Sequence, residues 1–232
     1  MKGFFENLGF FASRFNQAIV ITIELSIISL VAATIIGIIV GLINTSKSKS
    51  VIMKIFKAIA NLYIYIIRGT PMLVQILIIY FGLGQMLRPI GFRWLNIGGT
   101  FTAGTVALSL NAGAYMAEIV RGGIEAVDKG QIEAARSLGL TYGKTMKKIV
   151  LPQALRTMLP SIINQFIISI KDTSLLSVIG LTELTNVGKT IAATQSAHMM
   201  VIYCFMACYY LFICTVLAQV SKVVEKRLSY GK

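Results

Sequence analysis

Long apolar runs divide the chain into five segments that are long enough, or nearly long enough, to cross a lipid bilayer. About 20 apolar residues in a helix span the hydrocarbon core, and backbone polar groups inside lipid must find their hydrogen-bond partners within such a helix. The pattern therefore predicts an all-α polytopic membrane protein with five transmembrane helices. The segments are residues 18–43, 58–84, 101–120, 157–170 and 199–220.

Two of these segments are irregular. The second is interrupted by Arg68-Gly69-Thr70-Pro71, where Pro71 has no N–H group to donate to the carbonyl of Ile67. The fourth contains Pro160 and is shorter than a bilayer span, so it crosses only if flanking residues extend it. Interrupted or short helices mark the binding site in many transporters. The pattern therefore draws attention to the second and fourth segments.

The amino-acid composition supports a lipid environment. Hydrophobic residues make up 56% of the chain and charged residues only 13%, which is about half the charged fraction of a soluble protein. No linker, low-complexity tract or internal repeat divides the sequence, so we expect one domain over residues 1–232. The three cysteines share the last apolar run and the single histidine has no partner at metal-ligand spacing, so neither a disulfide framework nor a metal site is expected.

The net charge of +13 comes from basic residues that gather in three polar stretches. These are residues 45–57, residues 121–156 and the tail after residue 220, and together they hold fifteen of the 22 Lys and Arg residues. Cytoplasmic loops of membrane proteins retain Lys and Arg, so we expect these stretches and the C-terminus in the cytoplasm and the N-terminus outside. Nucleic-acid binding is not expected, because no basic stripe interleaved with aromatic residues lies outside the apolar runs.

The long polar stretch over residues 125–152 has the pattern of two short helices joined by a sharp turn. Strong helix formers begin it, with Ile132, Ala135 and Leu138 spaced for one face of a helix. Gly139 suits the left-handed backbone position that commonly ends a helix. The sequence therefore predicts a short amphipathic helix that stops at this glycine.

A second, basic helix is expected after the turn. Thr141 can cap this helix over residues 142–150, ahead of Leu151-Pro152. One interpretation is a hairpin that lies on the lipid surface, as basic amphipathic helices do. The other is a compact knob that fits a groove on a second protein, and the small Ala134-Ala135 pair favours this one.

The order of residues in this stretch resembles the cytoplasmic coupling motif of ATP-binding cassette (ABC) importer permeases. The matching residues are Glu133, Ala134, Ala135, Gly139, Ile149, Leu151 and Pro152. Further segments are similar to the polar amino acid uptake branch of these permeases, and they occur in the matching order along the chain. These segments are residues 68–75, 111–122 and 171–175.

This resemblance implies the transmembrane domain of a type I ABC importer in the bacterial inner membrane, with five helices in each permease subunit. It implies an ATPase subunit whose groove receives Glu133 to Gly139, an extracytoplasmic solute-binding protein, and a second permease subunit, which we expect to be another copy of this chain. The solute would be a polar amino acid. The resemblance assigns ATP and Mg²⁺ to the ATPase subunit, so we expect this chain to be neither an enzyme nor a cofactor carrier, and it contains no phosphate-loop pattern.

Ionisable groups inside the apolar segments are the candidates for solute contact, because a charge in the membrane is costly and usually functional. Glu24 or Glu118 could receive the ammonium group of an amino acid, and Arg68 its carboxylate. Tyr115 and Glu118 lie four and seven residues after Asn111, so the three residues form one polar stripe on the same helix. The two acids favour a solute with extra positive charge, while an amide or cystine stays open.

Internal ion pairs are the alternative interpretation of these charges. Glu118 can pair with Arg121 one turn later, and Arg68 can pair with Asp172. Asp172 belongs to the stretch 171–174, which we expect to shape the outer end of the fourth helix or to form an ordinary capped turn.

Three other functions fit the sequence less well. An ion channel would need a selectivity-filter sequence, and a membrane enzyme would need a catalytic partner for His198 or a Gly-x-Ser-x-Gly motif. An exporter of this class usually carries a fused ATPase. None of these features occurs in the chain.

Overall fold

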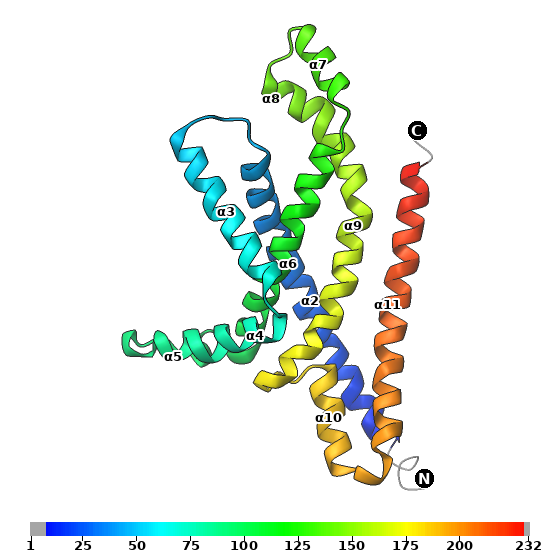
Figure 1. Cartoon of the computed structure of the whole chain (residues 1–232). Coiled ribbons are helices and arrows are strands. Elements are labelled where there is room, and N and C mark those ends of the chain that lie inside the picture. The colour runs from blue at the N-terminus through cyan, green and yellow to red at the C-terminus, as the bar shows by residue number, and fades with distance from the viewer. Residues whose placement is uncertain (1–7, 230–232) are drawn as a thin grey trace.

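In the computed structural model, every regular element of the described part of the chain, residues 8–229, is a helix (Figure 1). Residues 1–7 and 230–232 lie outside this part. The two chain ends, for which the charge pattern predicts opposite sides of the membrane, belong to these residues. The α-helices are α2 (Leu8–Thr45), α3 (Val51–Gly69), α4 (Met72–Leu77), α5 (Gly84–Met86), α6 (Gly99–Glu125), α7 (Lys129–Ser137), α8 (Tyr142–Thr145), α9 (Leu151–Asp172), α10 (Leu184–Thr194) and α11 (Met199–Ser229). The π-helices are η1 (Ile78–Leu83) and η4 (Met146–Val150), and the 3-10 helices are η2 (Arg88–Ile90), η3 (Trp94–Ile97), η5 (Thr173–Ile179) and η6 (Ser196–His198).

Helices α2 and α6 cross in close contact at the centre of the molecule (Figure 1). Two glycines of α2 permit this approach: a Cβ atom at Gly37 would lie 2.3 Å from the Cβ atom of Met116, and one at Gly41 would lie 2.7 Å from that of Val120. Helix pairs in membranes commonly use small residues in this way. As a result α6 is the most buried helix of the core, with α2 on one side and α3 and α9 on the others.

Within residues 8–229, three helical stretches are long and apolar enough to cross a membrane, namely Phe11–Thr45, Tyr142–Ile179 and Ser196–Arg227. A fourth crossing results if Val51–Gly69 and Met72–Met86, which are bent against each other, form one span. The 27 residues of α6 are long enough as well, although charged residues interrupt its apolar run. The predicted all-α fold is confirmed, and the predicted segments correspond to α2, the α3–α5 stretch, α6, α9 and α11.

The second predicted segment differs from the expected single helix with a local interruption. The chain bends by 111° between α3 and α4, and α4 to α5 then run sideways from the other helices (Figure 1). Thr70 has an extended backbone, with φ −123° and ψ 146°, because a residue that precedes proline is driven out of the helical region. Pro71 therefore redirects the chain instead of merely loosening one turn.

The fourth predicted segment is longer than its apolar core. Helix α9 begins at Leu151, contains Pro160 without ending there, and continues through η5 to Ile179. The flanking residues extend the helix, as the sequence required for a crossing.

The two ends of the molecule have different structures (Figure 1). The α7–α8 hairpin lies at one end, together with the C-terminal end of α11, and α10 lies at the other end beside the start of α2. Between them, α2, α3 and α11 expose many large apolar side chains. Such a broad apolar surface is expected where lipid or another membrane chain covers a protein.

Glu183 is a fully buried acid that the sequence analysis did not single out. It precedes α10, and its carboxylate accepts hydrogen bonds from the backbone N–H groups of Thr185 and Asn186. The hydroxyl of Tyr210 on α11 donates a third hydrogen bond to it at 3.0 Å. Glu183 therefore caps α10 and fastens it to α11, which is a structural role.

Candidate functional site

The α7–α8 hairpin is closed by hydrogen bonds from its own residues. Gly139 has a left-handed backbone, with φ 81°, as the sequence predicts. Its N–H donates to the carbonyl of Arg136 at 3.0 Å, and the N–H of Leu140 donates to the carbonyl of Ala135 at 3.1 Å. This pair of bonds is the Schellman motif, in which glycine is favoured because it lacks a Cβ atom. The predicted stop of the first helix is therefore confirmed.

The starts of the two hairpin helices are capped by side chains. The hydroxyl of Thr141 accepts the N–H of Lys144, which confirms the predicted cap of the second helix. The carboxylate of Asp128 accepts the N–H of Gly130 at the start of α7, a cap that the sequence analysis did not name. An Asp directly before a helix of strong helix formers is a signal that could have found it.

The faces of α7 differ in part from the expected pattern. Ala135 is buried and Ile132 is partly buried, but Leu138 is 84% exposed, so the prediction that these three residues share one face is wrong for Leu138. The helix ends at Ser137, and the cap position carries Leu138 away from the helix face. Ala134 is exposed as well. The outer surface of the hairpin therefore presents a small apolar patch next to the turn.

The other motif residues lie on the inner side of the hairpin or at its base. Glu133 is exposed and lines a cavity beneath α7. Leu151 and Pro152 are the first two residues of α9, which follows η4 without a gap. The basic helix that the sequence predicts, α8 with η4, runs directly into α9, so that movement of the hairpin would be transmitted along a membrane helix.

The bend between α3 and α4 is closed by a side chain that the sequence analysis did not assign. Nε2 of Gln75 donates to the carbonyl of Ile67 at 2.8 Å, and so replaces the N–H group that Pro71 lacks. The same nitrogen lies 3.0 Å from the carbonyl of Thr70. Asn111 on α6 donates to Oε1 of Gln75 at 2.9 Å. The predicted polar residue Asn111 is buried, and its amide holds the Gln75 side chain at the bend.

A cluster of charges lies beside this bend. Arg68 at the end of α3 pairs with Glu118 on α6 at 3.3 Å, and Arg121 pairs with the same carboxylate at 2.9 Å. The guanidinium of Arg68 also lies 5.4 Å from the ring centre of Tyr115, within the range of a cation–π contact. Arg121 further pairs with Glu125 at 2.7 Å. Both guanidinium groups are matched by a carboxylate, so the cluster is neutral overall.

Two open cavities of about 520 Å³ and 510 Å³ share these residues. Arg68, Tyr115 and Glu118 line both. The first cavity is also lined by Ser161, Asn164 and Gln165 of α9, which follow Pro160 and which the sequence analysis did not propose. Polar residues at helical spacing after an intramembrane proline were the signal that could have found them.

Two predicted site residues lie elsewhere. Glu24 is exposed on the face of α2 that carries Ile27, Ile28 and Val31, and it lines neither cavity. Asp172 is half-buried at the end of α9, and within the described residues Arg68 pairs with Glu118 instead. The structure therefore brings together Arg68, Tyr115 and Glu118, places Asn111 behind them, and leaves Glu24 and Asp172 apart.

Comparison with known proteins decides the family. Residues 33–230 match the family described as the binding-protein-dependent transport system inner membrane component. The chain belongs to this family. The permease is 40% identical over 207 residues to the glutamine transport system permease protein GlnP of Escherichia coli, which covers 89% of each chain. It is 36% identical over 212 residues to the arginine transport system permease protein ArtQ of Bacillus subtilis, which covers 91% of each.

Solved structures agree with this assignment. The permease superposes on a chain of a crystal structure of an amino acid ABC transporter with histidines, with a TM-score of 0.85 and 34% identity over 96% of this chain and 98% of that one. The MetNI methionine ABC transporter in an inward facing conformation shares the fold, with a TM-score of 0.69 and 18% identity over 90% and 95% of the two chains. The resemblance found in the sequence is confirmed.

The permease is therefore a membrane subunit of an ABC importer of the inner membrane. In this family the ATPase activity lies in a separate subunit, and the family description itself implies a substrate-binding protein as a partner. Within the described residues, no group of three potential metal ligands comes together.

Proposed function

We propose that this permease conducts a polar amino acid and that Arg68 and Glu118 receive it. The single observation that carries the proposal is that both residues line both cavities between the membrane helices, next to the bend after α3. A free amino acid carries a carboxylate and an ammonium group, which match a guanidinium and a carboxylate. The named substrates of the similar permeases, glutamine and arginine, are both polar amino acids.

The charge balance of the cluster suggests how the solute enters it. Glu118 is shared between Arg68 and Arg121, so an arriving carboxylate can take Arg68 while Arg121 still holds Glu118. The solute ammonium group then replaces Arg68 beside Glu118. The ion-paired cluster itself is neutral, and Glu225 adds a further carboxylate to the lining of one cavity, so both an amide and a basic side chain of the solute have a partner there.

We propose that the α7–α8 hairpin is the coupling element over residues 125–152 of a single permease domain, residues 1–232. Glu133, Ala134, Ala135 and Gly139 would meet the ATPase subunit, and Leu151-Pro152 would pass its movement to α9. The exposed Leu138 and Ala134 beside the turn supply an apolar contact for a groove.

The orientation follows from the positions of the basic residues. The hairpin and the end of α11 lie at one end of the molecule (Figure 1), and both belong to the Lys- and Arg-rich stretches. The positive-inside rule assigns this end to the cytoplasm. The C-terminus is then cytoplasmic, the N-terminus is outside, and the solute-binding protein docks at the end formed by α10.

A second permease subunit completes the pathway in this proposal, and a second copy of this chain is the candidate. Glu24 sits on an exposed apolar face of α2, where a charge needs either a protein partner or water. A facing subunit would enclose that residue in the pathway between the two permeases.

Uptake by the complete transporter tests the solute site. The permease, its ATPase subunit and its binding protein are reconstituted in liposomes, and uptake of labelled glutamine, arginine, histidine and cystine is measured. Arg68→Ala should reduce uptake roughly tenfold or more, because a charge-assisted contact is worth about 1.5–3 kcal/mol. Arg93→Ala, which changes an exposed residue outside the cavities, is the matched control. Unchanged uptake in Arg68→Ala and Glu118→Gln would refute the site.

A further inference from the structure

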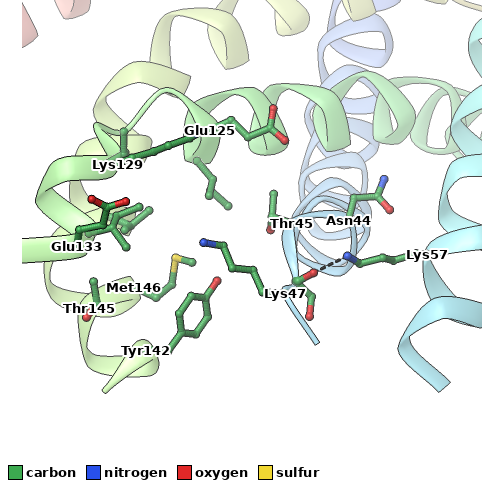
Figure 2. A pocket seen from close by; sticks show the side chains of 15 residues that line it. Asn44, Thr45, Lys47, Lys57, Glu125, Lys129, Glu133, Tyr142, Thr145 and Met146 are labelled. Atoms are coloured by element: carbon green, nitrogen blue, oxygen red, sulfur yellow. Dashed lines mark hydrogen bonds between the residues drawn. The ribbon is translucent and has the colours of Figure 1, made fainter. Parts of the chain in front are cut away.

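A third cavity, of about 620 Å³, lies at the proposed cytoplasmic end and takes no part in the solute site. Its walls come from the connection between α2 and α3, from the end of α6, and from the α7–α8 hairpin (Figure 2). The base of the cavity is apolar and continuous with a buried cluster of the core. The apolar lining residues are Ile124, Val127, Ile132, Met146 and Val150.

Three lysines reach this cavity from opposite walls. Lys47 extends from the α2–α3 connection into the space in front of Tyr142 and Met146, and Lys129 lies on the α7 side (Figure 2). Lys57 donates a hydrogen bond to the backbone carbonyl of Ser46, which leaves its positive charge uncompensated.

The acids of the cavity do not neutralise these lysines. Glu125 is engaged by Arg121 at 2.7 Å, which leaves Glu133 as the other carboxylate of the lining. Within residues 8–229, none of the three lysines forms an ion pair with an acid. The cavity therefore has an excess of positive charge above an apolar base.

One further polar atom of the lining lacks a partner. Oδ1 of Asn44 is buried and accepts no hydrogen bond within the described structure. Because this oxygen is buried, a hydroxyl of a ligand in the cavity would reach it only after the Asn44 side chain rotates.

We infer that this cavity binds the headgroup of an anionic phospholipid, with the phosphate held by Lys47, Lys57 and Lys129 and a glycerol hydroxyl near Asn44. Basic pockets between membrane helices on the cytoplasmic side bind such headgroups, and the apolar base suits the adjoining glycerol and acyl carbons. The inference rests on the proposed orientation, which places this end at the cytoplasmic leaflet. Phosphatidylglycerol combines the phosphate with the hydroxyl donor.

The position of the site gives the lipid a role in coupling. The headgroup would join the α2–α3 connection to the hairpin that receives the ATPase movement, because lysines from both walls hold it. A bound headgroup therefore stiffens the link between the hairpin and the membrane helices. Removing it should loosen the hairpin without touching the cavities around Arg68.

The thermal stability of the complex of permease and ATPase tests this site without any transport. The complex is delipidated and titrated with short-chain phosphatidylglycerol, with short-chain phosphatidylcholine, or with inorganic phosphate. Phosphatidylglycerol near 100 times its dissociation constant should raise the melting temperature by roughly 5 °C or more, and the other two ligands should not. An equal rise with inorganic phosphate would overturn the lipid assignment, as would no rise at all.

Matched variants separate the cavity from general surface charge. Combined Lys47→Gln, Lys57→Gln and Lys129→Gln should abolish the shift, whereas Lys47→Arg, Lys57→Arg and Lys129→Arg should keep it. Combined Lys144→Gln, Lys147→Gln and Lys148→Gln removes an equal number of positive charges from the hairpin outside the cavity, and it should keep the shift. Equal loss in both glutamine triples would overturn the site. Since no amino acid is present, failure here leaves the proposed solute site standing.

Discussion

Two of the places where the chain reverses or bends between helices, the α7–α8 turn and the bend after α3, are closed in different ways. At the hairpin, the bonds that end α7 come from Gly139 and Leu140, all within six residues of the carbonyls that accept them. At the membrane bend, the carbonyl of Ile67 is satisfied by Gln75 from beyond the break, and Asn111 from α6 holds that side chain in place. The hairpin turn is therefore a local break, closed by residues that are neighbours in the sequence. The membrane bend is a tertiary break, whose closure depends on a residue from another helix.

The surroundings of the two breaks explain this difference. The hairpin is exposed, so water can satisfy any polar group that the turn leaves free. At the bend, the amide that satisfies the carbonyl of Ile67 is itself buried, because the Gln75 side chain lies between α4 and α6. A side-chain amide is suited to this place, because it offers a donor to the backbone and an acceptor to a neighbouring helix.

The largest effect is expected at Gln75, because its loss opens the tertiary break. Gln75→Leu leaves the carbonyl of Ile67 and the amide of Asn111 without partners. We expect a loss of about 3 kcal/mol in stability, which corresponds to roughly 6–12 °C in melting temperature for a chain of this size. The measurement is thermal unfolding of the purified permease in detergent.

Gln85→Leu is the matched control for this prediction. Gln85 lies on α5 and is exposed, so the same substitution there should change the melting temperature little. If both variants unfold at the wild-type temperature, the bend does not depend on the Gln75 amide.

The next largest effect is expected from a substitution of Gly139, which forms the local break at the hairpin turn. Gly139→Ala introduces a Cβ atom at φ 81°, which costs about 1–2 kcal/mol. No atom lies within 4 Å of that Cβ position, so the cost is conformational and not steric. We expect the hairpin to loosen and the number of solute molecules carried per ATP hydrolysed to fall, while the melting temperature of the membrane helices stays close to that of the wild type.

Gly143→Ala is the natural comparison on the same hairpin. Gly143 has an ordinary helical backbone and open space around it, so alanine should be tolerated there or stabilise α8 slightly. Equal coupling ratios in the two alanine variants would show that the left-handed turn does not matter for transport.

The same contrast explains how much could be predicted from the sequence. The stop at Gly139 and the cap at Thr141 follow from local rules, and both are confirmed. The break at Pro71 was predicted from its missing donor, but neither the 111° angle nor the partner Gln75 could be, because they depend on where α6 lies.

In the candidate solute site, too, contacts within one helix could be predicted from the sequence and contacts between helices could not. The polar stripe with Tyr115 and Glu118 was predicted from helix spacing, and the pair of Glu118 with Arg121 was foreseen as an alternative. The partner of Arg68 was not, because that contact spans two helices far apart in sequence. Leu138 was misplaced, since the spacing rule holds only while the helix continues, and α7 ends one residue earlier.

The smallest effect on stability is expected from the ion pair of Arg68 with Glu118, although it lies beside the tertiary break. The side chains are 44% and 27% exposed, and pairs open to solvent contribute about 1 kcal/mol or less. A double-mutant cycle of Arg68→Ala and Glu118→Gln, followed by thermal unfolding, should therefore give a coupling energy below about 1 kcal/mol.

A weak pair is what the proposed solute site requires. The hydrogen bonds of the Gln75 amide close the bend. In the proposed solute site, by contrast, the contact of Arg68 with Glu118 opens each time a solute carboxylate arrives. If the coupling energy were several kcal/mol, the ion pair would be about as stable as the hydrogen bonds of Gln75. A solute amino acid could then break the pair only at a large cost in its own binding affinity. Such a result would indicate that Arg68 is a structural residue that joins α3 to α6, and that it is not a solute ligand.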